Sequence, residues 1–146
     1  MTDERWTPRK VEERMAEAAS VMRRLPEVRV RGYFNTWPTI IPEFSDLVGR
    51  EPPRMKPPSP SPAAITRTDE AMEWLKWLEP DDARIVWMRA ENRRWKTICW
   101  KVGLARSAAW ERWVIGLCII TCKLNRERIP SHPARLRALA KELRRL

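Results

Sequence analysis

Proline is the feature that most constrains what this chain can fold into. Thirteen prolines occur in 146 residues, and six of them lie between Glu51 and Pro62. A proline inside a helix removes a backbone hydrogen bond and clashes with the preceding turn, and a proline inside a sheet removes a ladder bond. Residues 27–62 are therefore predicted to form an extended arm or linker, with helices before and after it.

Apolar side chains within this arm predict that part of it packs on the body of the protein. A free linker is polar, whereas residues 33–44 are rich in aromatic and aliphatic side chains. We expect these side chains to dock on the helices, and a short helix over Pro42–Val48. They are Tyr33, Phe34, Trp37, Ile40, Ile41 and Phe44.

Capping residues predict the helices on either side of the arm. Thr7 before Pro8, and Ser61 before Pro62, each place a hydroxyl acceptor ahead of a proline at the first helical position. The first helix, in residues 1–26, carries a narrow apolar stripe that packs either on the body or against a second copy. A basic helix is predicted in the tail, residues 125–146. The helix after Ser61 is expected to bury Ile65, Ala71, Met72, Leu75 and Leu78.

The remaining periodicity is helical, and no strand pattern of any length occurs. We therefore predict an all-α protein whose residues 63–124 form a helix-turn-helix domain. Residues 113–122 are apolar on nearly every side, so they lie either in the core or in a subunit interface. A homo-oligomer, with a dimer favoured, is expected. Four tryptophans at helical spacings are predicted to be core residues: Trp74, Trp77, Trp87 and Trp113.

Positive charge is concentrated in residues 81–146. Residues 1–80 contain 13 Lys and Arg against 13 Asp and Glu, whereas residues 81–146 contain 16 against 6. Lys and Arg that neutralise phosphates supply most of the non-specific affinity of proteins for nucleic acid. This half is therefore predicted to bind double-stranded DNA, and a solvated basic surface is the alternative.

Residues 81–124 have the pattern of a helix-turn-helix. Such a motif needs two helices that cross steeply over a short turn and are held by a few buried apolar residues. Ile98 packs the first helix, Gly103 provides a left-handed turn, and Trp113 anchors the second helix. Ala105 stands where a capping side chain is usual, at a cost of about 1 kcal/mol. Other expected core positions are Cys99, Val102, Leu104 and Ala109.

Two resemblances follow from particular segments. The stretch Ile98-Cys99-Trp100-Lys101-Val102-Gly103-Leu104-Ala105-Arg106 resembles the helix-turn-helix of sigma-factor region 4 and of resolvase-type DNA-binding domains, whose usual pattern is Ile-Ala-x-x-Leu-Gly-Val-Ser-Arg. The segments Arg31-Gly32-Tyr33, Pro58-Ser59-Pro60 and Glu73 to Arg84 resemble a phage- and prophage-associated bacterial family of unknown function. These resemblances imply a phage or prophage transcriptional regulator. The alternatives are a small-terminase-like DNA-recognition subunit of a packaging machine and a sigma-like protein that binds RNA polymerase or phage proteins.

The resemblance implies that the helix 106–113 enters the major groove and reads bases. Arg106 is expected to pair with guanine, Ser107 with a base or a phosphate, and Glu111 with the amino group of cytosine. Trp110 either contacts a thymine methyl group or sugar, or packs inside the protein. Five flanking cations are expected to contact phosphates: Arg93, Arg94, Lys96, Lys101 and Arg112.

Catalysis, metal binding and a membrane span are not indicated. The lone His132 lies in the basic tail, where no nucleophile and base can be paired around it. Cys118 and Cys122 stand among isoleucines and read as small hydrophobic residues rather than as zinc ligands. No apolar run approaches the roughly 20 residues that span a bilayer, and no secretory leader is visible. We expect a cytoplasmic, non-enzymatic protein without a cofactor.

Overall fold

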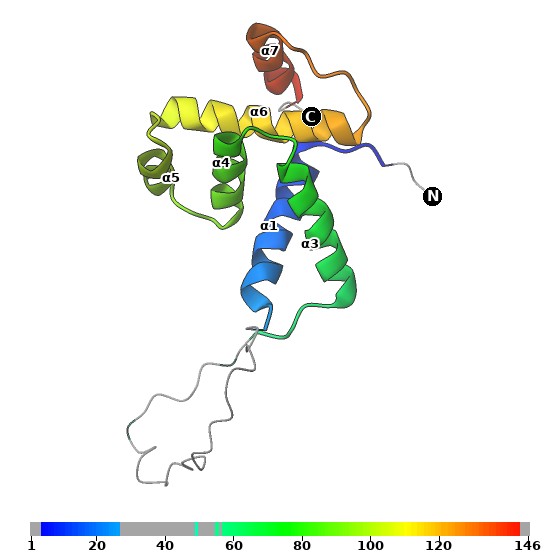
Figure 1. Cartoon of the computed structure of the whole chain (residues 1–146), viewed down its shortest axis with the longest axis vertical. Helices are drawn as coiled ribbons and strands as arrows, with labels where there is room; N and C mark the ends of the chain where they lie inside the picture. Colours follow the sequence, from blue (N-terminus) through cyan, green and yellow to red (C-terminus); the bar gives the residue numbers. More distant parts are fainter. Residues whose placement is uncertain (1–3, 27–48, 50–54, 56, 144–146) are drawn as a thin grey trace.

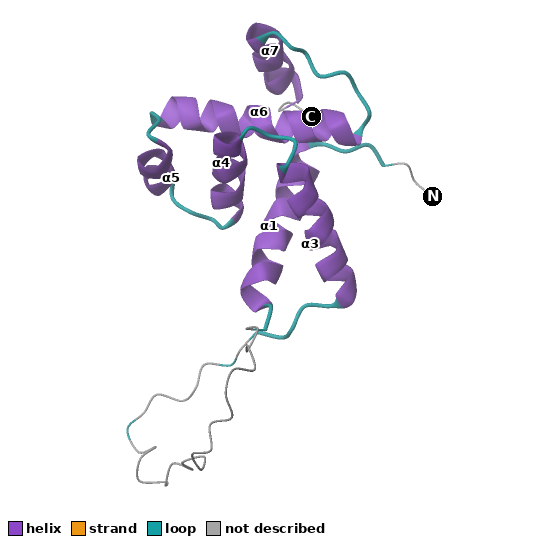
Figure 2. Ribbon diagram, viewed as in Figure 1, coloured by secondary structure: helices purple, strands orange, loops and turns teal. Residues whose placement is uncertain are grey.

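The computed structural model describes residues 4–26, 49, 55 and 57–143. All regular structure in these residues is helical, which confirms the all-α class. Most of the predicted arm, including the helix expected over Pro42–Val48 and the apolar side chains from Tyr33 to Phe44, lies outside the described residues. The helices (Figures 1 and 2) are α1 (Pro8–Arg24), α3 (Pro62–Leu75), α4 (Pro80–Ala90), α5 (Trp95–Val102), α6 (Arg106–Leu124) and α7 (Pro133–Leu143).

Both predicted hydroxyl caps are confirmed. The side chain of Thr7 accepts a hydrogen bond of 3.3 Å from the backbone N–H of Lys10, at the start of α1. The side chain of Ser61 accepts one of 3.2 Å from the backbone N–H of Ala64, at the start of α3. In each case the proline that follows occupies the first helical position, where its missing N–H leaves no intrahelical bond unmade.

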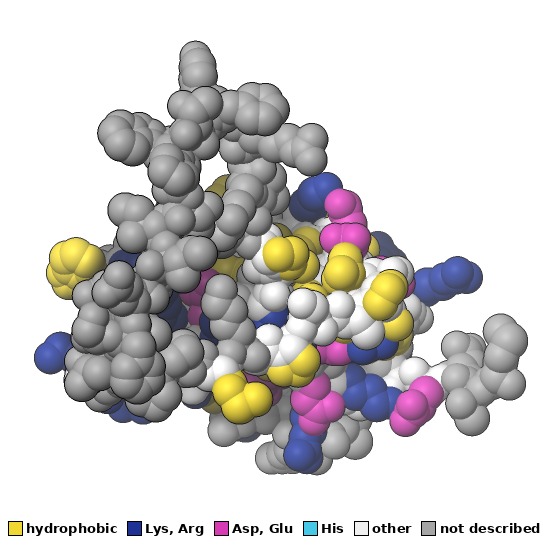
Figure 3. All heavy atoms as spheres, turned by 90° about the horizontal axis from the view of Figure 1, so that it is seen from below, with side chains coloured by type: hydrophobic (Ala, Val, Ile, Leu, Met, Phe, Trp, Pro, Cys, Tyr) yellow, Lys and Arg dark blue, Asp and Glu magenta, His cyan; other side chains and the backbone are white. Residues whose placement is uncertain are grey.

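Helices α1 and α3 lie side by side (Figure 1) and share one hydrophobic cluster. Val11, Met15 and Ala18 of α1 meet Ala71 and Trp74 of α3 in this cluster, so the apolar stripe of α1 packs on the body of the protein. Seen from below, hydrophobic side chains lie among charged ones of both signs (Figure 3).

The predicted buried face of α3 is partly wrong. Ile65 and Met72 are each 37% exposed, whereas Ala64 and Thr68 are buried. Small side chains let two helix backbones approach closely, and Thr68 satisfies its own hydroxyl by donating to the backbone oxygen of Ala64 at 2.9 Å. The inward side of α3 therefore consists of small residues and Trp74, whereas Ile65 and Met72 lie at its flank.

Helix α6 is the central element of the fold, and α1, α4, α5 and α7 all pack on it. Its C-terminal half is in the core, where Leu117, Cys118 and Ile120 are buried. Gly116 lies at the crossing of α6 with α4. A Cβ atom added there would lie 3.1 Å from Cγ2 of Val86 and 3.5 Å from Cδ1 of Leu78. Residues 116–118 and 120–122 of the apolar segment are thus core residues, whereas Val114 and Ile115 are half-buried.

A second hydrophobic cluster holds α5 against α4 and α6. Ile85, Met88 and Ile98 are its buried residues, and Trp95 and Trp113 pack against them. The two tryptophan rings meet edge to face with centroids 5.7 Å apart. Of the other expected core positions, Ala109 is buried, and Val102, Leu104 and Cys99 are half-buried.

The turn between α5 and α6 is formed by residues 103–105, and its geometry follows from Gly103. Gly103 adopts φ 69° and ψ 31°, and its N–H donates to the backbone oxygen of Cys99 at 2.9 Å. Ala105 precedes α6 without a side-chain cap, as predicted. The two predicted helices and their turn are therefore present, while their use in DNA recognition stays a prediction.

Of the four tryptophans predicted to be core residues, one is exposed. Trp74 is only 5% exposed, and Trp87 and Trp113 are half-buried beside the first cluster. Trp77 was expected in the core, and this is wrong, because α3 ends at Leu75 and leaves Trp77 37% exposed. The ammonium group of Lys123 lies 5.3 Å from the centroid of its ring.

Helix α7 returns to pack on α6 (Figure 1). The helix predicted in the tail is therefore present, and it has an apolar side on which Ala140 is buried and Leu136 and Leu139 are half-buried. Among the described residues, no helix combines the length and the apolarity that crossing a membrane requires.

Replacing Gly116 by valine tests the close crossing of α4 and α6. We expect Gly116→Val to lower the free energy of unfolding by about 1 to 3 kcal/mol, because its γ-carbons must displace Val86. Gly116→Ala is the matched control and should cost less, since alanine regains about 1 kcal/mol of helix propensity. Urea unfolding measures both variants. Equal stability of Gly116→Val and the parent would mean that the two helices cross farther apart.

Candidate functional site

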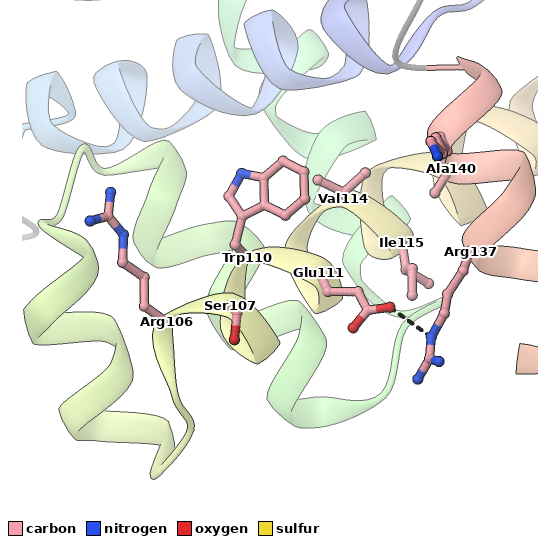
Figure 4. A pocket seen from close by; sticks show the side chains of 9 residues that line it. Arg106, Ser107, Trp110, Glu111, Val114, Ile115, Arg137 and Ala140 are labelled. Carbon is pink, nitrogen blue, oxygen red and sulfur yellow. Dashed lines mark ion pairs between the residues drawn. The ribbon is translucent and has the colours of Figure 1, made fainter. Parts of the chain in front are cut away.

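The four residues predicted to read bases lie together on the outer face of α6. Arg106 and Ser107 are exposed in its first turn, and Trp110 and Glu111 are half-buried one turn later. The spacing of three and four residues places them on one side of the helix. All four border the same groove between α6 and α7 (Figure 4).

This groove has a volume of about 830 Å³. Val114 and Ile115 continue the α6 wall beyond Glu111, and α7 supplies Ala140 on the opposite side. In Figure 4 the apolar side chains lie between Arg106 at one end and Arg137 at the other. The site thus combines an apolar middle with charged ends.

An ion pair joins the two walls of the groove. Nε of Arg137 lies 2.6 Å from Oε1 of Glu111. The two side chains are 64% and 41% exposed, so solvent screens the pair and its net stabilisation is small. The pair nevertheless gives the Glu111 carboxylate a partner inside the protein. Arg137 was not among the predicted site residues, because nothing local in the sequence relates positions 26 residues apart.

The predicted phosphate contacts separate into two groups. Arg94, Lys96 and Lys101 are exposed, and none of them forms an ion pair with another residue in the described part of the chain. Arg93 is exposed too, with its Nε 3.4 Å from Oε2 of Glu91. These cations follow the loop after α4 and the outer side of α5.

Arg112 differs from the other predicted phosphate contacts because it faces α4. Its Nε lies 3.2 Å from Oδ1 of Asp82, whose side chain is only 15% exposed. Burial raises the pKa of the Asp82 carboxyl, Arg112 opposes this rise, and the neighbouring Glu79 and Asp81 add to it. Arg112 therefore compensates a buried charge on α4.

Trp100 is an exposed aromatic side chain on α5 that was not among the predicted site residues. It lies on α5 one helical turn after Lys96 and is 83% exposed. Its spacing from the core residue Ile98 indicates this exposure, because residues two apart in a helix point to different sides. An aromatic ring therefore adjoins the basic side of α5.

The thiols and the histidine do not form a reactive or metal-binding group in the described residues. Cys118 is buried, and burial together with Cys122 raises the pKa of its thiol to about 12. Among the residues described, no three His, Cys, Asp or Glu side chains converge on a point where a metal ion would bind. The chemistry of the site therefore rests on its cations, its one carboxylate and its apolar wall.

These features define a small all-α protein whose candidate site lies on the outer face of its central helix. Residues 23–120 match the family described as "Domain of unknown function (DUF6362)", and the chain belongs to that family. The match covers about two thirds of the chain, contains the four predicted base-reading residues, and ends within α6 before α7 begins. No curated protein and no solved structure matches the chain.

Replacing Asp82 by asparagine tests whether burial raises the pKa of the carboxyl that pairs with Arg112. A carboxyl with a raised pKa in the folded state favours folding below its ordinary pKa, and this contribution is lost as the pH rises through the raised value. Asp82→Asn removes the titration, so its stability relative to the parent should be higher at about pH 7 than at about pH 3. Urea unfolding at both values measures this. The opposite trend would mean that attraction to Arg112 exceeds the effect of burial.

Proposed function

We propose that this protein binds double-stranded DNA and reads its sequence with the first turns of α6. The observation that carries the proposal is the unit of α5, a glycine turn and α6, with the polar side chains of Arg106 and Ser107 exposed at its outer end. Helix pairs of this kind present the N-terminal turns of the second helix to base edges. Arg106 suits guanine because its guanidinium donates two parallel hydrogen bonds, to O6 and N7.

The cations around α5 support the same orientation. Arg94, Lys96 and Lys101 are exposed and without carboxylate partners in the described part of the chain, so they are free to meet phosphates. Phosphate contacts fix the position of a protein on the duplex without carrying sequence information. In this arrangement α5 crosses the DNA backbone while the start of α6 lies in the major groove.

The position of α7 limits which side chains reach bases. An α-helix with its side chains is about 10–12 Å across, and the major groove is about 12 Å wide, so only one helix enters. Arg106 and Ser107 lie at the end of α6 remote from Arg137 (Figure 4) and are the foremost candidates. Glu111 pairs with Arg137 through Oε1, so Oε2 is the oxygen left to accept from cytosine.

A transcriptional regulator of a phage or prophage is the biological role we propose. DNA recognition in a packaging machine is the second candidate, and oligomeric state distinguishes the two. Light scattering of a monomer or dimer would favour regulation, whereas a ring of many copies would favour packaging.

Arg106→Ala is the variant that tests base reading. Selection from random duplexes should enrich a motif, and Arg106→Ala should weaken binding to that motif by about 1–3 kcal/mol while leaving non-specific binding nearly unchanged. Lys101→Ala is the matched control. It should weaken binding to all sequences alike and reduce the salt dependence by about one phosphate contact. Mobility-shift titration measures both variants.

Two results would overturn the proposal. Failure to bind any duplex at low salt would remove DNA recognition altogether and favour a sigma-like contact with RNA polymerase or another protein. Binding without an enriched motif, with Arg106→Ala and Lys101→Ala equal in effect, would leave only non-specific binding.

A further inference from the structure

We propose that the groove between α6 and α7 is a binding site for a small amphiphilic anion, that is, a molecule with an apolar body and one anionic head group. The groove is lined by side chains of α6 and α7, and these two helices pack on each other. Its volume of about 830 Å³ lies within the range of roughly 300–1,000 Å³ typical of small-molecule sites.

The apolar part of the groove has no role in reading DNA. Val114 and Ile115 come two helical turns after Arg106, and Ala140 belongs to α7, so none of them lies at the outer end of α6. Base edges and phosphates are polar, and apart from the thymine methyl group they offer nothing to an aliphatic surface. Half-buried aliphatic side chains beside a half-buried Trp110 favour a hydrocarbon or aromatic body instead.

The charges at the ends of the groove select an anion. Glu111 and Arg137 neutralise each other at 2.6 Å. Arg106 and Lys141 also line the groove, and within the described part of the chain neither has an ion-pair partner. Each of these uncompensated cations can attract a carboxylate, sulfonate or phosphate head group to its edge of the apolar surface.

This occupant would couple the groove to DNA binding. Arg106 borders the groove and is also the residue proposed to pair with guanine. A ligand anion bound to Arg106 and a DNA base compete for the same guanidinium, so each lowers the affinity for the other. Only this competition rests on the proposed function. Binding of the anion to the protein alone does not.

The test is titration of the full chain, without DNA, with decanoate below its micelle concentration. Isothermal titration calorimetry should find one saturable site per chain. Octanoate should bind about tenfold more weakly, because it buries two methylene groups fewer. Decanol should also bind about tenfold more weakly, because it cannot form the charge-assisted hydrogen bonds.

A matched pair of variants on α7 locates the site. Lys141 lines the groove and Arg135 does not, and both are exposed, so each can be reversed in charge without disturbing the core. We expect Lys141→Glu to weaken decanoate binding about tenfold and Arg135→Glu to leave it nearly unchanged. Circular dichroism confirms that both variants keep their helices.

The outcomes separate this site from the proposed function. Saturable decanoate binding that Lys141→Glu weakens and Arg135→Glu does not supports the site, and displacement of a bound duplex by decanoate supports the competition. Binding that neither variant changes, or equal affinity for decanoate and decanol, overturns the anion site even if DNA binding is intact. Absence of DNA binding with normal decanoate binding overturns only the proposed function. Lack of decanoate binding, with Lys141→Glu changing self-association, would assign the groove to a second copy of the chain.

Discussion

The structure depends on the close crossing of α4 and α6 at Gly116. Because a side chain there would meet Val86 at 3.1 Å, the two backbones approach as nearly as their side chains allow. The buried half of α6 then serves as a surface on which α1 and α4 pack. Since the exposed half belongs to the same continuous helix, its orientation follows from the core and needs no support of its own.

Two hydrophobic clusters are connected at Trp113. The first joins α1, α3, α4 and α6 around Val86 and Ile120, and the second joins α4, α5 and α6 around Ile85 and Ile98. Trp113 packs against both, and its ring and that of Trp95 from α5 meet edge to face. One ring therefore connects the first cluster with the cluster that holds α5. Tryptophan suits this position because it spans a large area with few rotatable bonds.

The sequence predicted those parts of the fold that depend on neighbours in the chain. The caps at Thr7 and Ser61 and the turn at Gly103 are local, and each follows from the chemistry of one or two residues. The buried face of α3 was misjudged because large apolar residues were taken as core, whereas the small Ala64 and Thr68 are buried and Ile65 and Met72 are partly exposed. Which side of a helix faces its neighbour depends on how closely the two backbones pack. That distance cannot be predicted from the residues of either helix alone. The groove between α6 and α7 could not be predicted for the same reason, because it forms only when α7 packs on α6.

Composition also overstates the cationic surface, and the structure shows which charges remain available. Residues 81–146 hold 16 Lys and Arg but only 6 Asp and Glu. Several of those few carboxylates engage cations that the sequence assigned to a partner: Asp82 faces Arg112, and Glu91 lies beside Arg93. Within the described residues, Lys123 forms a cation–π contact with the ring of Trp77 instead of an ion pair. The exposed cations that no carboxylate of the described residues engages include those of α5 and of the first turn of α6, where no acidic residue follows Glu91 until Glu111. The candidate interface is therefore defined less by how many cations the chain carries than by where it lacks carboxylates to neutralise them.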